Sequence, residues 1–232
     1  MDYSKPTLLV ISGPNGAGKS THIQTMLPVD FEGIWSFDRD NTRIAFEKSL
    51  SEQGIPPPEI LSKATRMMEE QLVLEMKKAI HTKKHFVLET PLSHPDYWAY
   101  LDLFERNGYQ IQLNYLCLDK VSDCIARVGQ RVIEGGHYVD PSTIKGVYEK
   151  NLQHINEYKD TFRLIELYDG MKVPTLLARI EDNLVKFAAK EAIKKNWIKS
   201  GMPSIGQKIK LFIQAHILSG RKVSRPRRHR GI

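Results

Sequence analysis

The sequence predicts an α/β protein whose central parallel sheet has helices on both faces. Short apolar runs alternate along the chain with longer segments of helical spacing, which is the pattern of repeated βαβ units. The first apolar run, residues 7–12, ends in a glycine-rich turn that leads directly into a helix. We therefore expect one sheet whose strands end at a common edge, where a ligand crevice forms.

Each element is predicted from periodicity and from its bounding glycines and prolines. Strands are expected at residues 7–12, 34–37, 85–89, 111–118 and 164–168, with residues 175–180 as a candidate sixth strand. Helices are expected at residues 18–26, 41–53, 59–78, 96–107, 121–133 and 141–158. The second helix should end at Gly54, because the three prolines that follow cannot lie inside a helix.

Charge divides the chain into a larger acidic part and a smaller basic part. The net charge is +7, yet residues 184–232 hold 13 Lys and Arg against one acid. The first 183 residues hold 21 bases against 26 acids. We therefore expect an α/β domain at residues 1–183, a basic helical extension at 184–220 with helices at 184–199 and 205–218, and a disordered basic tail at 221–232. Aromatic residues do not alternate with the basic ones there, so only weak, nonspecific nucleic-acid binding is expected.

The composition is that of a globular protein rather than a membrane or secreted one. Apolar residues make up 41% of the chain, and no apolar stretch is long enough to cross a bilayer. No apolar segment typical of a secretion signal precedes the first strand. Cys117 and Cys124 lack metal-site spacing and are interpreted as buried hydrophobic side chains. A cytoplasmic location without a membrane partner is expected.

The glycine-rich turn contains the P-loop motif G-x-x-x-x-G-K-[ST]. Its residues and the one that follows are Gly13, Pro14, Asn15, Gly16, Ala17, Gly18, Lys19, Ser20 and Thr21. Glycines let backbone N–H groups approach phosphate oxygens, and the N-terminus of the helix adds partial positive charge. We expect Lys19 to contact the β and γ phosphates of ATP, and the Ser20 hydroxyl to ligate Mg²⁺. The motif between strand and helix favours this interpretation over a glycine turn without a ligand.

Two acidic positions are expected at the same edge of the sheet. Asp38 and Asp40 follow the second strand, and Arg43 lies one helical turn later. A carboxylate there would accept a proton from a hydroxyl held against the γ-phosphate, although Asp40 would equally serve as a helix cap. Glu89 and Thr90 close the third strand, where a buried Glu should have a ligand, a metal-bound water or a cation nearby. A Glu that caps a helix or forms a salt bridge is the alternative.

Arg127 and Arg131 are four residues apart on one predicted helix and therefore point in the same direction. They precede the loop Gly135-Gly136, which is flexible enough to close over phosphates. Their guanidinium groups would clamp a transferring phosphoryl group. Taken without the P-loop, two solvated basic residues are the simpler interpretation.

In combination these motifs resemble the zeta toxin family of P-loop kinases. The likeness extends from about residue 7 to residue 180. Its residues are the P-loop at 13–21, Asp-x-x-Arg at 40–43, Glu-Thr-x-Leu-Ser at 89–93, Arg-Val-x-x-Arg-Val-x-x-Gly-Gly-His at 127–137, Gly108-Tyr109 and Leu167-Tyr168-Asp169. The order and number of the motifs make the likeness far more specific than any one of them.

The resemblance implies an ATP- and Mg²⁺-dependent kinase that phosphorylates the 3′-hydroxyl of UDP-N-acetylglucosamine, with a small helical antitoxin as partner. It implies that Lys19 binds phosphate, that Asp40 is the base, and that Glu89 and Thr90 hold the substrate. Arg127 and Arg131 take the lid positions. The chain departs from the family at Asp38, where Asn is frequent, and at Ile144-Lys145, where many members have arginine.

Two other functions remain open from the sequence. A P-loop kinase of another small hydroxyl substrate would use the same phosphate machinery with a different pocket. A nucleic-acid-directed ATP-binding protein would use the basic segment after residue 183. A nucleotide-binding switch without catalysis is disfavoured by the retention of Lys19, Ser20, Asp40 and Arg131.

Overall fold

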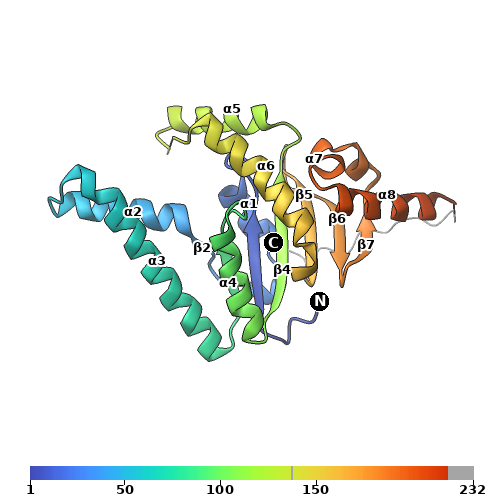
Figure 1. Cartoon of the computed structure of the whole chain (residues 1–232), viewed down its shortest axis with the longest axis horizontal. Helices are drawn as coiled ribbons and strands as arrows, with labels where there is room; N and C mark the ends of the chain where they lie inside the picture. Colours follow the sequence, from blue (N-terminus) through green and yellow to red (C-terminus); the bar gives the residue numbers. More distant parts are fainter. Residues whose placement is uncertain (137, 219–232) are drawn as a thin grey trace.

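The computed structural model describes residues 1–136 and 138–218, and within them one mixed sheet forms the centre of the molecule (Figure 1). Its strand order is β2-β3-β1-β4-β5-β6-β7. The strands are β1 (Thr7–Ser12), β2 (Phe37–Asp38), β3 (Phe86–Glu89), β4 (Gln110–Cys117), β5 (Leu164–Asp169), β6 (Thr175–Glu181) and β7 (Leu184–Ala188). The first five are parallel, and β6 and β7 are antiparallel to their neighbours.

Helices cover both faces of this sheet, as predicted. They are α1 (Lys19–Met26), α2 (Arg39–Glu52), α3 (Pro57–Thr82), α4 (Pro95–Arg106), α5 (Val121–Ile133), α6 (Pro141–Glu157), α7 (Asn196–Lys199) and α8 (Pro203–Leu218). Three short 3₁₀ turns lie at Val29–Phe31, Lys159–Thr161 and Lys190–Lys194. The α2–α3 pair forms an arm that extends from one edge of the sheet (Figure 1).

Alternation along β1 divides the core into two clusters. Leu8 and Val10 face the larger cluster, to which α3 through α8 all contribute buried side chains. Leu9 and Ile11 face the smaller one, which is closed by α1 and the 3₁₀ turn at Val29–Phe31. A strand buried on both sides is the expected form of a central parallel strand. It fixes where the P-loop begins, because the loop leaves the carboxyl end of β1.

Several predicted boundaries differ from the structure. β2 is two residues long and starts at Phe37, so the strand predicted at 34–37 is wrong over most of its length; Trp35 is 84% exposed there. Helix α2 begins at Arg39 and not at residue 41. Pro57 and Pro58 form the first turn of α3, where proline is tolerated because the first N–H groups lack helical partners anyway.

The basic helix predicted at residues 184–199 is also wrong. Residues 184–188 form β7, which pairs with β6 through a two-residue turn at Asp182 and Asn183. Both turn residues have positive φ, the conformation that a tight hairpin requires and that Asp and Asn tolerate. The second predicted helix is present as α8. The tail predicted to be disordered at 221–232 lies outside the described residues.

The segment after β7 packs into the main core. Trp197 and Ile198 of α7 are 1% and 0% exposed, and Ile205, Ile209 and Ile213 line the buried side of α8. Lys199 and Lys210 are exposed on the same elements, whereas Lys195 forms an ion pair with Asp169 at 2.6 Å. The basic charge of this region is therefore a surface property of elements that the core holds.

Candidate active site

The P-loop has the backbone conformation that a phosphate cradle requires. Gly16 and Gly18 have φ values of 81° and 93°, in the left-handed region that favours glycine. A Cβ on Gly16 would lie 2.4 Å from the carbonyl oxygen of Cys124, so the loop also packs directly against the start of α5. Gly18 is the N-cap of α1, and the loop therefore ends at the positive end of a helix.

Lys19 and Ser20, the first two residues of α1, meet Glu89 at the end of β3. The Ser20 hydroxyl donates a hydrogen bond to the Glu89 carboxylate at 3.1 Å. The Lys19 ammonium lies 3.9 Å from Oε1 of Glu89 and donates to the carbonyl oxygens of Gly13 and Pro14 at 3.0 and 3.3 Å. The ammonium group predicted to bind phosphate and the hydroxyl predicted to ligate a metal thus both lie next to the Glu89 carboxylate.

Glu89 is buried at this point, with 9% of its surface exposed. Burial raises the pKa of Glu89, Lys19 and the Ser20 hydrogen bond lower it, and the nearby carboxylates of Asp38 and Asp40 raise it further. The sequence argument that a buried Glu requires a cation is met by Lys19. The net direction is upward, with burial as the largest cause, so this environment disfavours the ionised carboxylate of Glu89.

At the start of α2, one aspartate caps the helix and the other faces the pocket. Asp38 is the N-cap, and its carboxylate accepts from the backbone N–H and the side-chain amide of Asn41 at 3.0 and 2.7 Å. Asp40 lies in the first turn and lines the pocket. The capping role therefore falls on Asp38, and the Asp40 carboxylate faces the space beside the P-loop. Arg43, one turn later, is ion-paired with Glu47 and lines the same space.

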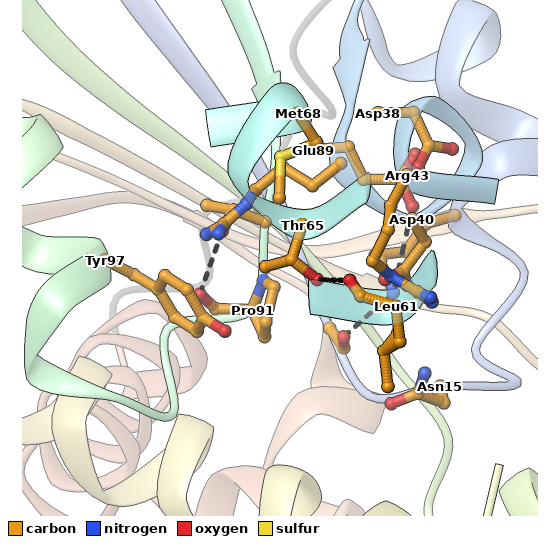
Figure 2. A pocket seen from close by; sticks show the side chains of 14 residues that line it. Asn15, Asp38, Asp40, Arg43, Leu61, Thr65, Met68, Glu89, Pro91 and Tyr97 are labelled. Carbon is orange, nitrogen blue, oxygen red and sulfur yellow. Dashed lines mark hydrogen bonds and ion pairs between the residues drawn. The ribbon is translucent and has the colours of Figure 1, made fainter. Parts of the chain in front are cut away.

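These side chains surround a pocket of about 290 Å³ (Figure 2). Its lining residues are Gly13, Asn15, Lys19, Asp38, Arg39, Asp40, Arg43, Leu61, Thr65, Met68, Glu89, Thr90, Pro91 and Tyr97. The P-loop forms one wall, α2 and α3 form another, and the ends of β3 and α4 complete it. Figure 2 shows Tyr97 on the opposite side of the pocket from Asp38 and Asp40. The structure thus brings together every predicted site residue from α2 and β3.

The two lid arginines are not part of this pocket lining. Arg127 lies beside the P-loop, near Gly18, and donates to the carbonyl oxygens of Gly170 and Met171 at 2.9 and 2.7 Å. Arg131 packs against Gly136, whose N–H donates to the Arg131 carbonyl. Both are residues of α5, and neither lines the pocket. Their contact with a phosphoryl group stays a prediction.

Sequence reasoning missed the residues that shape the far wall. Arg39, Thr65, Met68 and Tyr97 line the pocket although no motif includes them. Met68 is one of the apolar positions of α3, and an apolar position on a helix does not by itself predict a pocket wall. Arg39 carried a usable signal, because it stands between two aspartates at the end of a strand.

The fold and this site define a P-loop phosphotransferase of the kinase class. A parallel sheet ends in a phosphate cradle, and a pocket lined by carboxylates opens beside it. The family model described as Zeta toxin matches residues 1–172. The chain belongs to the zeta toxin family.

Solved structures share the fold at low sequence identity. A chain of the AvrRxo1-ORF1:AvrRxo1-ORF2 complex with ATP superposes with a TM-score of 0.65 at 14% identity; the match covers 87% of this chain and 65% of that one. This protein thus spans less than two thirds of that relative's length. A chain of the PezAT chromosomal toxin-antitoxin system of Streptococcus pneumoniae gives a TM-score of 0.55 at 16% identity, with 89% and 87% covered.

A sequence relative is an uncharacterized protein of Haemophilus influenzae, 26% identical over 140 residues, which are 59% of this chain and 88% of that one. No helix within residues 1–136 and 138–218 is both long and apolar enough to span a membrane. The cytoplasmic location stays a prediction.

Proposed function

We propose that this protein transfers the γ-phosphate of ATP to a sugar hydroxyl of a nucleotide sugar, with the 3′-hydroxyl of UDP-N-acetylglucosamine as the best candidate. The observation that supports this most is the shared pocket of Lys19, Asp40 and Glu89. A phosphoryl donor would enter from the P-loop side, and a hydroxyl acceptor would enter between α2, α3 and α4. Membership of the zeta toxin family supports the choice of acceptor.

In this proposal Asp40 accepts the proton of the attacking hydroxyl. Its carboxylate lines the pocket while Asp38 holds the helix start, so the base is free of a capping role. Lys19 would exchange its hydrogen bonds to the P-loop carbonyl oxygens for contacts with the β and γ phosphates, whose negative charge it would stabilise during transfer. At the carboxyl end of β3, the Glu89 carboxylate would accept a hydrogen bond from a hydroxyl of the sugar substrate. The hydroxyl of the almost fully buried Thr90 would donate one to it.

The same residues fit a magnesium ion. The Ser20 hydroxyl and the Glu89 carboxylate are hard oxygen donors 3.1 Å apart, with Asp38 and Asp40 nearby. The residues that the structure describes contain no group of three or more His, Cys, Asp or Glu suited to a metal. This suits Mg²⁺, which takes few protein ligands beside phosphates and water. When bound, the ion would neutralise charge between the β and γ phosphates.

A direct assay tests the proposal. The pure protein would be incubated with ATP, Mg²⁺ and a panel of nucleotide sugars, and the products would be identified by mass. We expect one added phosphoryl group on UDP-N-acetylglucosamine, and loss of the product with Asp40→Asn. If the phosphoryl group is instead found on a different hydroxyl compound, that compound is the acceptor and UDP-N-acetylglucosamine is not. Absence of any transfer by a protein that binds ATP would contradict it.

A protein antitoxin is a second proposal. It is supported by the two structural neighbours, whose descriptions name a toxin-antitoxin system and a two-protein complex. Co-expression of this chain with the product of a neighbouring reading frame, followed by size-exclusion chromatography, would test it. We expect a stable complex that no longer binds ATP.

A further inference from the structure

Arg39 is held inside the acceptor pocket by three side chains from two other helices. It is the first residue of α2, its side chain is 12% exposed, and it lines the pocket. One guanidinium nitrogen, Nη2, is ion-paired with Glu69 of α3. The guanidinium carbon lies 4.5 Å from the ring centre of Tyr97 and 5.6 Å from that of Tyr100, both on α4. Stacking and ion pairing together fix the plane of the group.

Both carboxylate oxygens of Glu69 accept a hydrogen bond in this cluster. One carboxylate oxygen of Glu69 accepts from Arg39, and the other accepts from the Tyr100 hydroxyl at 2.5 Å. Burial and the bond to Glu69 raise the pKa of Tyr100 to about 12, so this hydroxyl stays a donor at neutral pH. The arrangement therefore orients the guanidinium but satisfies only one of its two terminal nitrogens.

The other terminal nitrogen, Nη1, is buried and has no hydrogen-bond partner within the described part of the chain. A buried N–H donor on a charged group is costly to leave unpaired, and such groups are paired in most folded proteins. Nη1 carries two N–H donors, and the residue to which it belongs lines a pocket large enough to hold part of a ligand. The unpaired donor therefore indicates a missing acceptor atom from a bound molecule.

We propose that Nη1 of Arg39 binds a phosphate oxygen of the acceptor substrate, and so selects acceptors that carry a phosphate or diphosphate group. The inference rests on the proposed function, because it takes this pocket as the acceptor site. Arg39 adjoins Asp40, the proposed base, in the first turn of α2. Arg39 would bind the phosphate of the acceptor, and Asp40 would receive the proton of its hydroxyl. Arginine suits this role because its rigid, permanently charged fork matches phosphate oxygens.

The acceptor, and not ATP, is the expected source of this oxygen. The phosphates of ATP have their own cation in Lys19 and their own N–H donors in the P-loop. Arg39 stands with Tyr97 and with Met68 of α3 in the wall formed by the arm and α4. A neutral carbonyl oxygen would also accept from Nη1, but a charged donor bound to an anion forms the stronger hydrogen bond.

The test is a binding measurement with the P-loop already occupied. Protein saturated with Mg²⁺ and a non-hydrolysable ATP analogue would be titrated with inorganic pyrophosphate, UDP and uridine by calorimetry. The variants are Arg39→Met and Arg39→Lys, and the matched control is Arg66→Met, an exposed arginine of α3 that pairs with Glu70. Loss of one charge-assisted hydrogen bond should weaken pyrophosphate and UDP binding by roughly 10- to 100-fold in both Arg39 variants. The control should bind as the parent does.

Three results would overturn the inference. The first is binding of pyrophosphate and UDP to Arg39→Lys that is unchanged from the parent. This variant keeps the charge and a partner for Glu69, so it can be measured even if Arg39→Met does not fold. The second is a parent protein that binds neither ligand. The third is uridine binding that depends on Arg39 as strongly as UDP binding, which would assign Nη1 to a base carbonyl. Because pyrophosphate contains no sugar, a failed transfer assay with nucleotide sugars remains distinguishable from all three.

Discussion

Replacing Asp40 by Asn separates the chemistry of α2 from its stability. Asn has the size of Asp but cannot take a proton, so transfer should fall by about 10²- to 10⁴-fold, the usual span of general base catalysis. That loss corresponds to about 3–5 kcal/mol in the activation barrier. ATP binding should persist, because the P-loop wall of the pocket is untouched.

The stability effect can be worked out from the helix start. The cap hydrogen bonds of α2 belong to Asp38, so Asp40→Asn loses only the interaction of a charge with the helix N-terminus, about 0.3–1 kcal/mol. For a chain of this size each kcal/mol shifts the midpoint of thermal unfolding by about 2–4 °C. Asp38→Asn keeps a good cap and should be nearly neutral, whereas Asp38→Ala should lose about 1 kcal/mol.

Single-turnover transfer, binding of a fluorescent ATP analogue and thermal unfolding by circular dichroism would be measured on all three variants. The ordering is the informative part. If Asp38→Asn abolishes transfer while Asp40→Asn works normally, the base is two residues upstream of our assignment. If both transfer normally, this helix start is structural and the proton leaves by another route.

Three further predictions concern the cradle, the buried carboxylate and the C-terminal segment. Lys19→Ala should lower transfer by orders of magnitude without unfolding the protein, and activity within about threefold of the parent would refute its role. Glu89→Gln should lower transfer yet raise the free energy of unfolding near pH 7, because burial raises the pKa of Glu89 and ionisation costs the folded state free energy. Below about pH 4.3, where the carboxyl is protonated in both states, that gain should vanish in pH-dependent unfolding. Trp197→Ala should cost about 3–5 kcal/mol in denaturant unfolding, whereas Trp35→Ala, at an 84% exposed side chain, should cost less than about 0.5.

The elements with strong local signals were predictable from the sequence. The β1–P-loop–α1 unit is specified by an apolar run and a glycine pattern. The bounds of β1 match the prediction to the residue, and α1 begins one residue after the predicted start. The clustering of Asp38, Asp40 and Glu89 followed from a rule of topology, since parallel strands end at one edge.

The failures have equally local causes. Over residues 184–199 the high lysine count favours an exposed helix, whereas Val185 and Phe187, which alternate with Lys186, favour the strand that forms. The Asp182-Asn183 pair before it is typical of a tight turn, and both residues have positive φ. The position of Arg39 beside two aspartates has a sequence signal, but its contacts with Tyr97 and Glu69 join three helices and could not be predicted from local sequence.

The residues that line the pocket come from two separate segments of the chain. The donor side comes from residues 13–19, whereas every other lining residue falls between Asp38 and Tyr97, in the stretch that holds α2, α3 and the start of α4. Under the proposed function, acceptor preference can therefore change within one continuous segment of the chain while the phosphate cradle stays fixed. A chimaera of two relatives in which only this segment is exchanged should prefer the acceptor of the relative that supplies the segment. Its nucleotide preference should be that of the relative that supplies the rest of the chain.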